Sequence, residues 1–389
     1  MRRALSLTAS MMLAVPLAAC GGSSDGGGSG PVTVGVLLPL TGASAQGAEQ
    51  AENALELRLD QINAEGGVDG RDVELKVYDT KLDPATATQQ AQRAISQDRV
   101  AALIGPWTST EALAVGEVVE RAGVVTINNS ASAPAITEDK EYVFRTSPRT
   151  PDLAVAIAQV GTGTGAANGA LLYDGSSFGL GAKDPIEAAA EDEGLDLVTS
   201  VEYPIGASDV SAQVASVVEK DPGVVIIAGA AGADYGLIAK AMQEQGLAVP
   251  IIGLSPIVSP DALRIGEGAY AALPGVYTVG CVDETKPAYS ELLEDYNEEF
   301  TPVEVLPEQA LQAVDALNWI VAGLGETQGE GSDELVGALT SLPAVESVGG
   351  RTGARQQFTT EDHDAYGEGY LVPYQVVDGG LAQADLDVD

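Results

Sequence analysis

The chain has 389 residues, 45% of them hydrophobic, and carries a formal net charge of −38 from 57 acidic and 19 basic residues. This length predicts two domains with sizeable cores, and the composition is not that of a disordered protein. A chain with this much negative charge repels phosphate backbones, and no nucleic-acid partner is therefore expected. We attribute the acidity to a need for solubility, as in a salty environment.

The first residues have the composition of a secretion signal. Arg2 and Arg3 precede an apolar stretch of about fifteen residues, which suits a signal peptide at 1–19 and is too short for a membrane span. The stretch ends Leu-Ala-Ala-Cys, which resembles the lipobox of bacterial lipoproteins. The resemblance implies cleavage before Cys20 and lipidation of its sulfur. The alternative is cleavage of the ordinary A-x-A type, with Cys20 incidental.

Residues 20–30 are expected to be the lipidated cysteine and a flexible tether, because GGSSDGGGSG is too polar and too rich in glycine to fold. Cys281 is then the only other cysteine. No intrachain disulfide is therefore expected, and the sequence assigns Cys281 no role.

From residue 31 onward, strand patterns and helix patterns alternate. In the helix at 48–64, for example, Leu55, Leu59 and Ile62 are spaced by four and three residues, which places them on one face. The first set comprises strands at 32–40, 73–79, 100–104 and 124–128 and helices at 48–64, 84–96 and 111–123. Such alternation predicts a parallel, doubly wound sheet.

The pattern restarts after residue 152, which predicts a second lobe of the same design. This set comprises strands at 169–174, 195–204, 223–229 and 249–254 and helices at 180–193, 209–220 and 234–246. Further helices are expected at 285–299, 307–324 and 332–341, followed by a glycine-rich tail of weak periodicity. The α/β class is therefore expected in both lobes.

The segment GPWTST, residues 105–110, ends a buried strand with a row of hydroxyls. Ser109 or Thr110 is a natural N-cap for the helix that follows. The same hydroxyls, together with free N–H groups at the positive end of a helix, would also suit an anion. The local sequence leaves both interpretations open.

Two other patterns suggest enzymes. Residues 175–179 read G-S-S-F-G after a strand and before a helix, the context of a nucleophile elbow, so a serine esterase using Ser177 and the single histidine, His363, is an alternative. Residues 161–169, GTGTGAANG, precede a strand rather than follow one, so we expect a loop there and no dinucleotide site. The acidic segment at 359–369 lacks metal-ligand spacing and predicts a solvated turn. No metal and no cofactor are expected.

Seven segments, in order along the chain, resemble the leucine/isoleucine/valine-binding type of periplasmic solute-binding protein: VGVLLPLTG (34–42), INAEGGVDGR (62–71), YDTKLDPATA (78–87), LIGPWTS (103–109), YVFRTSP (142–148), YDGSSFG (173–179) and VIIAGA (225–230). The resemblance implies two doubly wound parallel-sheet lobes, the type I periplasmic binding fold, joined by three hinge crossovers. One lobe would be 31–147 plus 284–345, and the other 148–283 plus 346–389.

The resemblance also implies ligand-binding residues. They are a carboxylate seat at Trp107, Thr108 and Ser109, a second hydroxyl loop at Ser130, Ala131 and Ser132, and an aromatic from the other lobe, Phe178. The chain departs from the family in two places. The first loop, 43–47, has no aromatic, and Ser255 stands where amino-acid binders place an acid for the ammonium. Asp234 is a candidate substitute, with helix N-cap as its alternative role.

The expected function is that of an extracytoplasmic, monomeric solute-binding lipoprotein and not of an enzyme. It would capture a branched-chain amino acid or related small carboxylate and deliver it to the permease of an ABC importer. Cys20 would tether it to the outer face of the bacterial cytoplasmic membrane or the periplasmic side, with no contact to the membrane other than this anchor. A sensor module for a non-amino carboxylate or amide is the second alternative beside the esterase.

Overall fold

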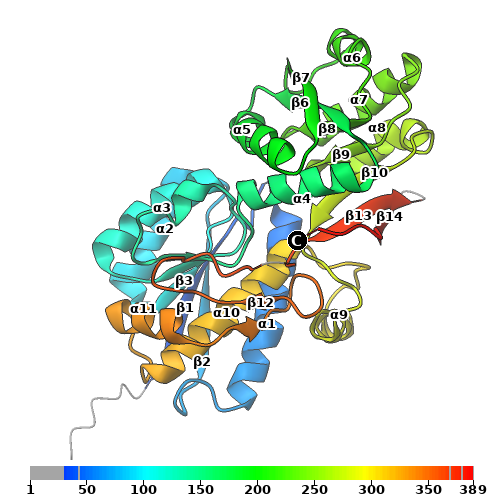
Figure 1. Ribbon diagram of the computed structural model, residues 1–389. Helices are drawn as coiled ribbons and strands as arrows, with labels where there is room; N and C mark the ends of the chain where they lie inside the picture. Colours follow the sequence, from blue (N-terminus) through cyan, green and yellow to red (C-terminus); the bar gives the residue numbers. More distant parts are fainter. Residues whose placement is uncertain (1–29, 43, 368, 378–379, 389) are drawn as a thin grey trace, which may run out of the picture.

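Two separate sheets organise the chain, and each forms the centre of its own lobe (Figure 1). The computed structural model describes residues 30–42, 44–367, 369–377 and 380–388. The predicted signal peptide, Cys20 and most of the tether lie outside the described residues. Within them, no helix is both long enough and apolar enough to span a membrane.

The first lobe has a five-stranded parallel sheet in the order β2-β1-β3-β4-β5. Its strands are β1 (Val32–Leu38), β2 (Val73–Asp79), β3 (Ala102–Ile104), β4 (Thr126–Asn128) and β5 (Val143–Arg145). Its helices are α1 (Ala45–Ala64), α2 (Pro84–Arg93), α3 (Ser109–Ala122), α9 (Pro287–Glu299), α10 (Glu308–Glu326) and α11 (Ser332–Ser341). Short π and 3₁₀ segments follow α2 (Ala94–Asp98) and β4 (Pro134–Ile136).

The second lobe repeats the strand order of the first and adds two antiparallel strands at one edge, giving β14-β13-β10-β9-β8-β6-β7. Its strands are β6 (Asn168–Asp174), β7 (Asp196–Tyr203), β8 (Val224–Ala228), β9 (Ile251–Gly253), β10 (Val276–Gly280), β13 (Val372–Val377) and β14 (Gly380–Gln383). Its helices are α4 (Thr150–Gly163), α5 (Ser177–Asp192), α6 (Ser211–Val218), α7 (Gly232–Glu244) and α8 (Pro260–Tyr270), with a 3₁₀ turn at Ser255–Val258.

Local sequence explains most of these elements. All five residues of β8 are buried, as expected of a parallel strand covered on both faces. Helix α2 starts where Asp83 accepts a hydrogen bond from the N–H of Thr86, with proline at its first position. The predicted loop at 161–169 is partly wrong, because residues 161–163 form the last turn of α4. The prediction of two lobes of one design is confirmed.

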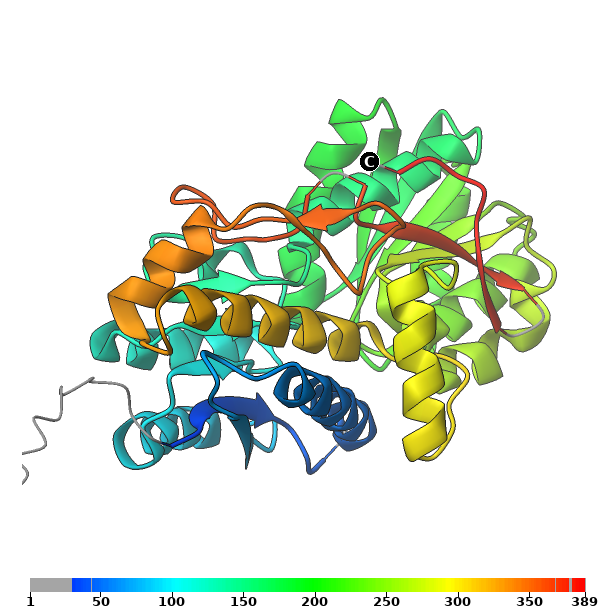
Figure 2. The same cartoon turned by 90° about the horizontal axis from the view of Figure 1, so that it is seen from below.

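The chain crosses between the lobes three times, as predicted: between β5 and α4, between β10 and α9, and between Ala365 and β13. The tail, however, does not lie wholly in the second lobe. Phe358 and Ala365 are buried in the core of the first lobe, and only the part from about residue 370 pairs with the second sheet. Figure 2 shows the tail passing over both lobes as its colour changes from orange to red. The expected boundary at residue 346 therefore requires correction.

The acidic segment of this tail is only in part the solvated turn that was predicted: residues 359–362 are exposed and form a turn, whereas residues 363–366 are packed. Asp364 forms a parallel bridge with Arg145 of β5, extending the edge of the first sheet. The ring of His363 stacks on Phe144 at 4.0 Å between centroids. The reason for the difference is the charge of β5, because Arg145 is fully buried and needs a carboxylate partner. A short pair, β11 (Val345–Glu346) with β12 (Arg355–Gln356), precedes this segment.

Candidate functional site

A pocket of about 130 Å³ lies between the lobes and is lined by residues from both. Loops at the carboxyl ends of β4, β5, β9 and β10 contribute to it, which is where open α/β sheets bind ligands. The starts of α5 and α10 complete the wall. The lining residues are Ser130, Ser132, Ser147, Pro148, Leu153, Phe178, Leu254, Ser255, Val279, Cys281, Glu308, Gln309 and Gln312.

The loop after β4, residues 130–133, supplies two of the predicted serines and is held from behind by polar side chains. The Oδ1 atom of Asn128 accepts hydrogen bonds from the N–H of Ser130 at 3.2 Å and of Ala131 at 2.7 Å. Arg145 donates from Nη1 to the carbonyl of Ala133 at 2.8 Å. We call residues 130–133 the serine loop. Its backbone is therefore fixed before any ligand arrives.

The hydroxyls of Ser130 and Ser132 lie at the pocket, and neither donates a hydrogen bond within the described part of the chain. The Ser132 hydroxyl accepts from Thr150 at 3.2 Å, which leaves its own proton free. No group in the described part of the chain forms a hydrogen bond with the Ser130 hydroxyl. Ser147, which sequence reasoning did not single out, donates to the carbonyl of Ala131 at 3.1 Å and also lines the pocket. Ala131 is buried and contributes its backbone.

The start of α3, predicted as the carboxylate seat, does not line this pocket. Thr108, rather than Ser109 or Thr110, is the N-cap, and it forms a capping box with Glu111. The buried Glu111 carboxylate therefore already occupies the positive end of the helix. Ser109 accepts from the N–H of Ala133 at 3.4 Å, so it supports the serine loop from outside. Trp107 packs against the core of the first lobe.

Phe178 lines the pocket from the second lobe. It lies in the first turn of α5 and is 37% exposed, which leaves its ring free to cover a ligand. The helix is capped by Ser176, whose hydroxyl accepts from the N–H of Gly179 at 3.1 Å. A Cβ on Gly179 would lie 2.3 Å from the Asp174 carboxylate. Gly179 thus serves the close approach of the helix to the sheet.

His363 lies elsewhere. Its Nδ1 is 3.2 Å from the carbonyl of Val143, its ring stacks on Phe144, and burial lowers its pKa. It lines a surface pocket over the first lobe, together with Thr137 and Thr340, and not the pocket that Phe178 lines. The histidine is accounted for as a packing residue, so the geometry does not support the esterase interpretation.

Ser255 and Asp234, the two positions considered for the ligand ammonium, lie in different parts of the second lobe. Ser255 lines the pocket. Asp234 does not: it is fully buried on α7, where Oδ2 accepts from the N–H of Gly206 at 2.8 Å and Oδ1 has no partner in the described part of the chain. Burial raises the pKa of Asp234. It is not a helix N-cap either, since Ala231 holds that position.

Sequence reasoning missed the residues that α10 and β10 bring to the pocket. Glu308, Gln309 and Gln312 lie in the first turns of α10, and Figure 2 shows this helix running along the first lobe with its start toward the second. Gln312 donates to the Cys281 sulfur at 3.5 Å. Burial raises the pKa of both Glu308 and Cys281. No local motif marks these residues, because the second crossover places them at the pocket.

A second, more apolar pocket of about 260 Å³ adjoins the first. The two share Ser255, Val279, Cys281, Glu308 and Gln309. Beyond this shared wall the second pocket is lined mainly by aliphatic and aromatic side chains, among them Val258, Val282, Val305, Leu306, Tyr374 and Leu381. The polar pocket therefore has apolar space directly beside it.

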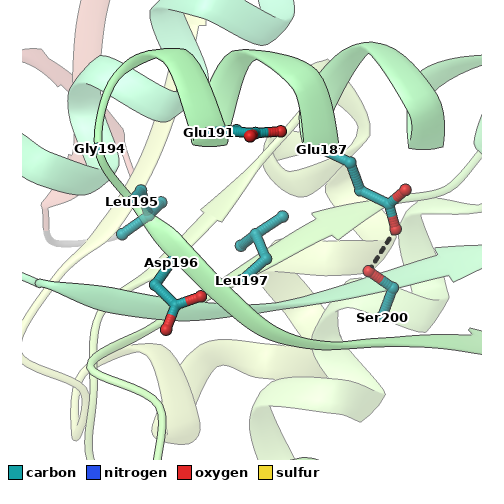
Figure 3. A pocket seen from close by; sticks show the side chains of 7 residues that line it. All are labelled: Glu187, Glu191, Gly194, Leu195, Asp196, Leu197 and Ser200. Carbon is teal, nitrogen blue, oxygen red and sulfur yellow. Dashed lines mark hydrogen bonds between the residues drawn. The ribbon is translucent and has the colours of Figure 1, made fainter.

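Figure 3 shows a larger hollow, of about 520 Å³, between α5 and β7 on the second lobe. It is lined by Glu187, Glu191 and Asp196, and Glu187 accepts from Ser200 at 2.6 Å and pairs with Lys183. None of its lining residues belongs to the pocket between the lobes. The described residues contain no cluster of three or more His, Cys, Asp or Glu side chains suited to a metal ion, here or elsewhere.

Comparison with known protein families agrees with this architecture of two α/β lobes and a pocket lined from the strand ends of both. The model of the periplasmic binding proteins matches residues 31–380. The chain belongs to this family. A substrate-binding protein of a chemotactic signal transduction system, BasB from Halobacterium salinarum, is 29% identical over 62% of this chain and 60% of its own length. Leu/Ile/Val-binding protein homolog 8 from Brucella abortus is 30% identical over 64% of this chain and 61% of its own length.

Solved structures of this periplasmic binding fold agree with the observed architecture. The leucine-binding protein LivK from Thermotoga maritima has a TM-score of 0.75 and 19% identity, covering 91% of this chain and 98% of its own. LivJ from Streptococcus pneumoniae, solved with isoleucine, has a TM-score of 0.72 and 20% identity, covering 91% of this chain and 98% of its own. A solute-binding protein from Rhodopseudomonas palustris, solved with 3,4-dihydroxybenzoic acid, has a TM-score of 0.73 and 23% identity, covering 92% of this chain and 98% of its own. At these identities the likeness establishes the fold, and the ligands belong to those proteins.

Proposed function

We propose that this periplasmic binding protein is the solute-binding component of an ABC importer and captures a small amino acid, in the first place a branched-chain one, between its lobes. The observation that carries the proposal is the pocket between the lobes, with hydroxyls on the first lobe and Phe178 on the second. The Brucella relative named for leucine, isoleucine and valine supports the ligand class.

In this proposal the ligand carboxylate binds to Ser130 and Ser132, whose loop is held rigid by Asn128 and Arg145. A rigid donor loop loses little entropy on binding. The apolar side chain extends toward Phe178 and the adjoining apolar pocket. Rotation about the three crossovers then brings the lobes together over the ligand. The closed form, acting as a monomer, is what the permease recognises.

The attachment to the membrane is part of the proposal. Lipidated Cys20 would hold the protein at the outer face of the cytoplasmic membrane or the periplasmic side, because two or more acyl chains bury methylene groups worth about 0.8 kcal/mol each. The glycine-rich residues after Cys20 would let the binding lobes reach a permease in the same membrane. No part of the chain is proposed to act as an enzyme.

A second candidate is a sensor that binds a carboxylate without an amino group. Ser255, which offers no charge where amino-acid binders carry an acid, favours it. The chemotactic relative from Halobacterium salinarum also favours it. Binding of an amino acid and its keto acid, measured side by side, separates the two candidates.

The test is calorimetry on the mature chain lacking the anchor, titrated with leucine and with 4-methyl-2-oxopentanoate, its keto acid. A hydrogen bond to a charged group contributes about 1.5–3 kcal/mol. Ser130→Ala and Ser132→Ala should therefore each weaken binding of either ligand by roughly 10- to 150-fold. Ser216→Ala, an exposed serine on α6, is the matched control. Absence of binding by every small carboxylate would refute the carboxylate seat.

A further inference from the structure

Glu308 is the only charged side chain among the residues that line the pocket between the lobes. It lies in the first turn of α10, and its Oε2 atom is 3.4 Å from where a Cβ on Gly280 would lie. Its carboxylate is therefore placed at the end of β10, on the wall shared by the polar and apolar pockets. The adjoining apolar pocket is lined by a second acid, the exposed Glu284, but of the two only Glu308 lines both pockets.

No lysine or arginine of the described chain neutralises this carboxylate with an ion pair. The buried Lys286 is engaged elsewhere, where it donates to Ser347 at 3.2 Å and to the carbonyl of Gly349 at 2.7 Å. The contacts of Glu308 are the thiol and N–H of Cys281, which can donate to it but carry no charge. Burial without a cation raises its pKa.

A purely structural role does not explain this placement. Acidic residues are favoured in the first turn of a helix, where the macrodipole contributes about 0.3–1 kcal/mol. That effect is available on any face of the helix. Glu334, in the first turn of α11, is stabilised by the helix macrodipole in the same way while its side chain remains exposed. Turning a carboxylate into a partly buried pocket instead carries a desolvation cost that an uncharged partner does not offset.

We propose that Glu308 binds the ammonium group of the ligand, in place of the acid that Ser255 does not supply. This inference rests on the proposed function and deepens it. Ser130, Ser132 and Glu308 all belong to elements of the first lobe. Both charges of a zwitterionic amino acid are therefore held by that lobe, and the second lobe closes over the ligand with Phe178. The site then selects α-amino acids over keto acids of the same shape.

The experiment compares leucine with 4-methyl-2-oxopentanoate by calorimetry on wild-type protein and three variants. Glu308→Gln keeps the shape and loses the charge, and it should weaken leucine binding by about 10-fold or more. Keto-acid binding should stay the same or become tighter. Glu334→Gln, the first-turn acid outside the pocket, and Asp234→Asn, the buried acid outside it, should each leave the preference for leucine unchanged.

Each outcome decides the question. Leucine binding within about two-fold of wild type in Glu308→Gln would overturn the inference, and so would an equal loss of both ligands, which indicates a structural role. If Glu308→Gln does not fold, Glu308→Asp replaces it: retention of the preference for leucine supports the inference, and its loss while both ligands still bind overturns it. Failure of wild-type protein to bind either ligand would instead refute the proposed function, and the inference with it.

Discussion

The ion pair between Arg145 and Asp364 allows a strong prediction about stability. The two side chains are 0% and 5% exposed, and Nε of Arg145 lies 2.7 Å from Oδ1 of Asp364. Arg145 also donates to Ala133 and to Thr137. It therefore connects β5, the serine loop and the tail. Asp364→Asn keeps the shape of the side chain but leaves a buried guanidinium without a countercharge.

Removing one partner of a buried ion pair costs 3–5 kcal/mol. Because Arg145 keeps its hydrogen bonds to the loop, we expect a loss near the lower end, about 3 kcal/mol. With a urea dependence of about 3 kcal/mol per molar, this corresponds to a midpoint lower by about 1 M. Both tryptophans of the chain, Trp107 and Trp319, pack in the first core. Tryptophan fluorescence during urea unfolding therefore reports on the lobe that contains the pair.

The matched control is Glu117→Gln, which breaks a pair with Lys140 of 2.8 Å in the same lobe. The carboxylate there is 63% exposed. Exposed pairs contribute about 1 kcal/mol or less, so the midpoint should barely move. If Asp364→Asn shifts the midpoint no more than Glu117→Gln does, the argument from buried charge is incorrect.

Three further predictions concern a buried acid within α10 (Asp315), the ligand and the anchor. Burial raises the pKa of Asp315 to about 7, so its contribution to stability is complete below about pH 4 and is lost as pH rises through 7. Asp315→Asn should flatten that fall in urea unfolding between pH 4 and 8, whereas an unchanged slope would contradict the assignment. Phe178→Ala should weaken leucine binding roughly ten-fold, as loss of about 1.5 kcal/mol of apolar burial requires, and calorimetry showing full affinity would remove Phe178 from the site. Cys20→Ser should abolish incorporation of a labelled fatty acid, and label that persists in this variant would disprove the lipid anchor.

Much of the fold follows from the sequence alone. Strand and helix patterns alternate in two sets, and the short apolar run that forms β8 is a fully buried parallel strand, as expected, whereas the more polar runs of β2 and β7 form the half-exposed edges of their parallel arrays. Proline and acidic residues also mark the helix starts where they are expected, as at Asp83. These features are readable because burial on both faces of a sheet and capping of a helix depend on residues close together in the chain. Ser132 and Phe178 were instead implied by the resemblance to the leucine/isoleucine/valine-binding family, and they lie in the loop after β4 and in the first turn of α5.

The charges of the site were decided only by the tertiary structure. The family resemblance implied the start of α3 for the carboxylate, and Asp234 was a candidate for the ammonium with helix N-cap as its alternative role. In the structure α7 turns Asp234 toward Gly206, and Glu111 occupies the start of α3. Glu308 carries no signal in its own segment. It reaches the pocket because the second crossover returns the chain to the first lobe with the start of α10 beside the end of β10. A carboxylate buried between lobes is defined by which distant elements pack around it, and residue patterns along the chain do not encode that arrangement.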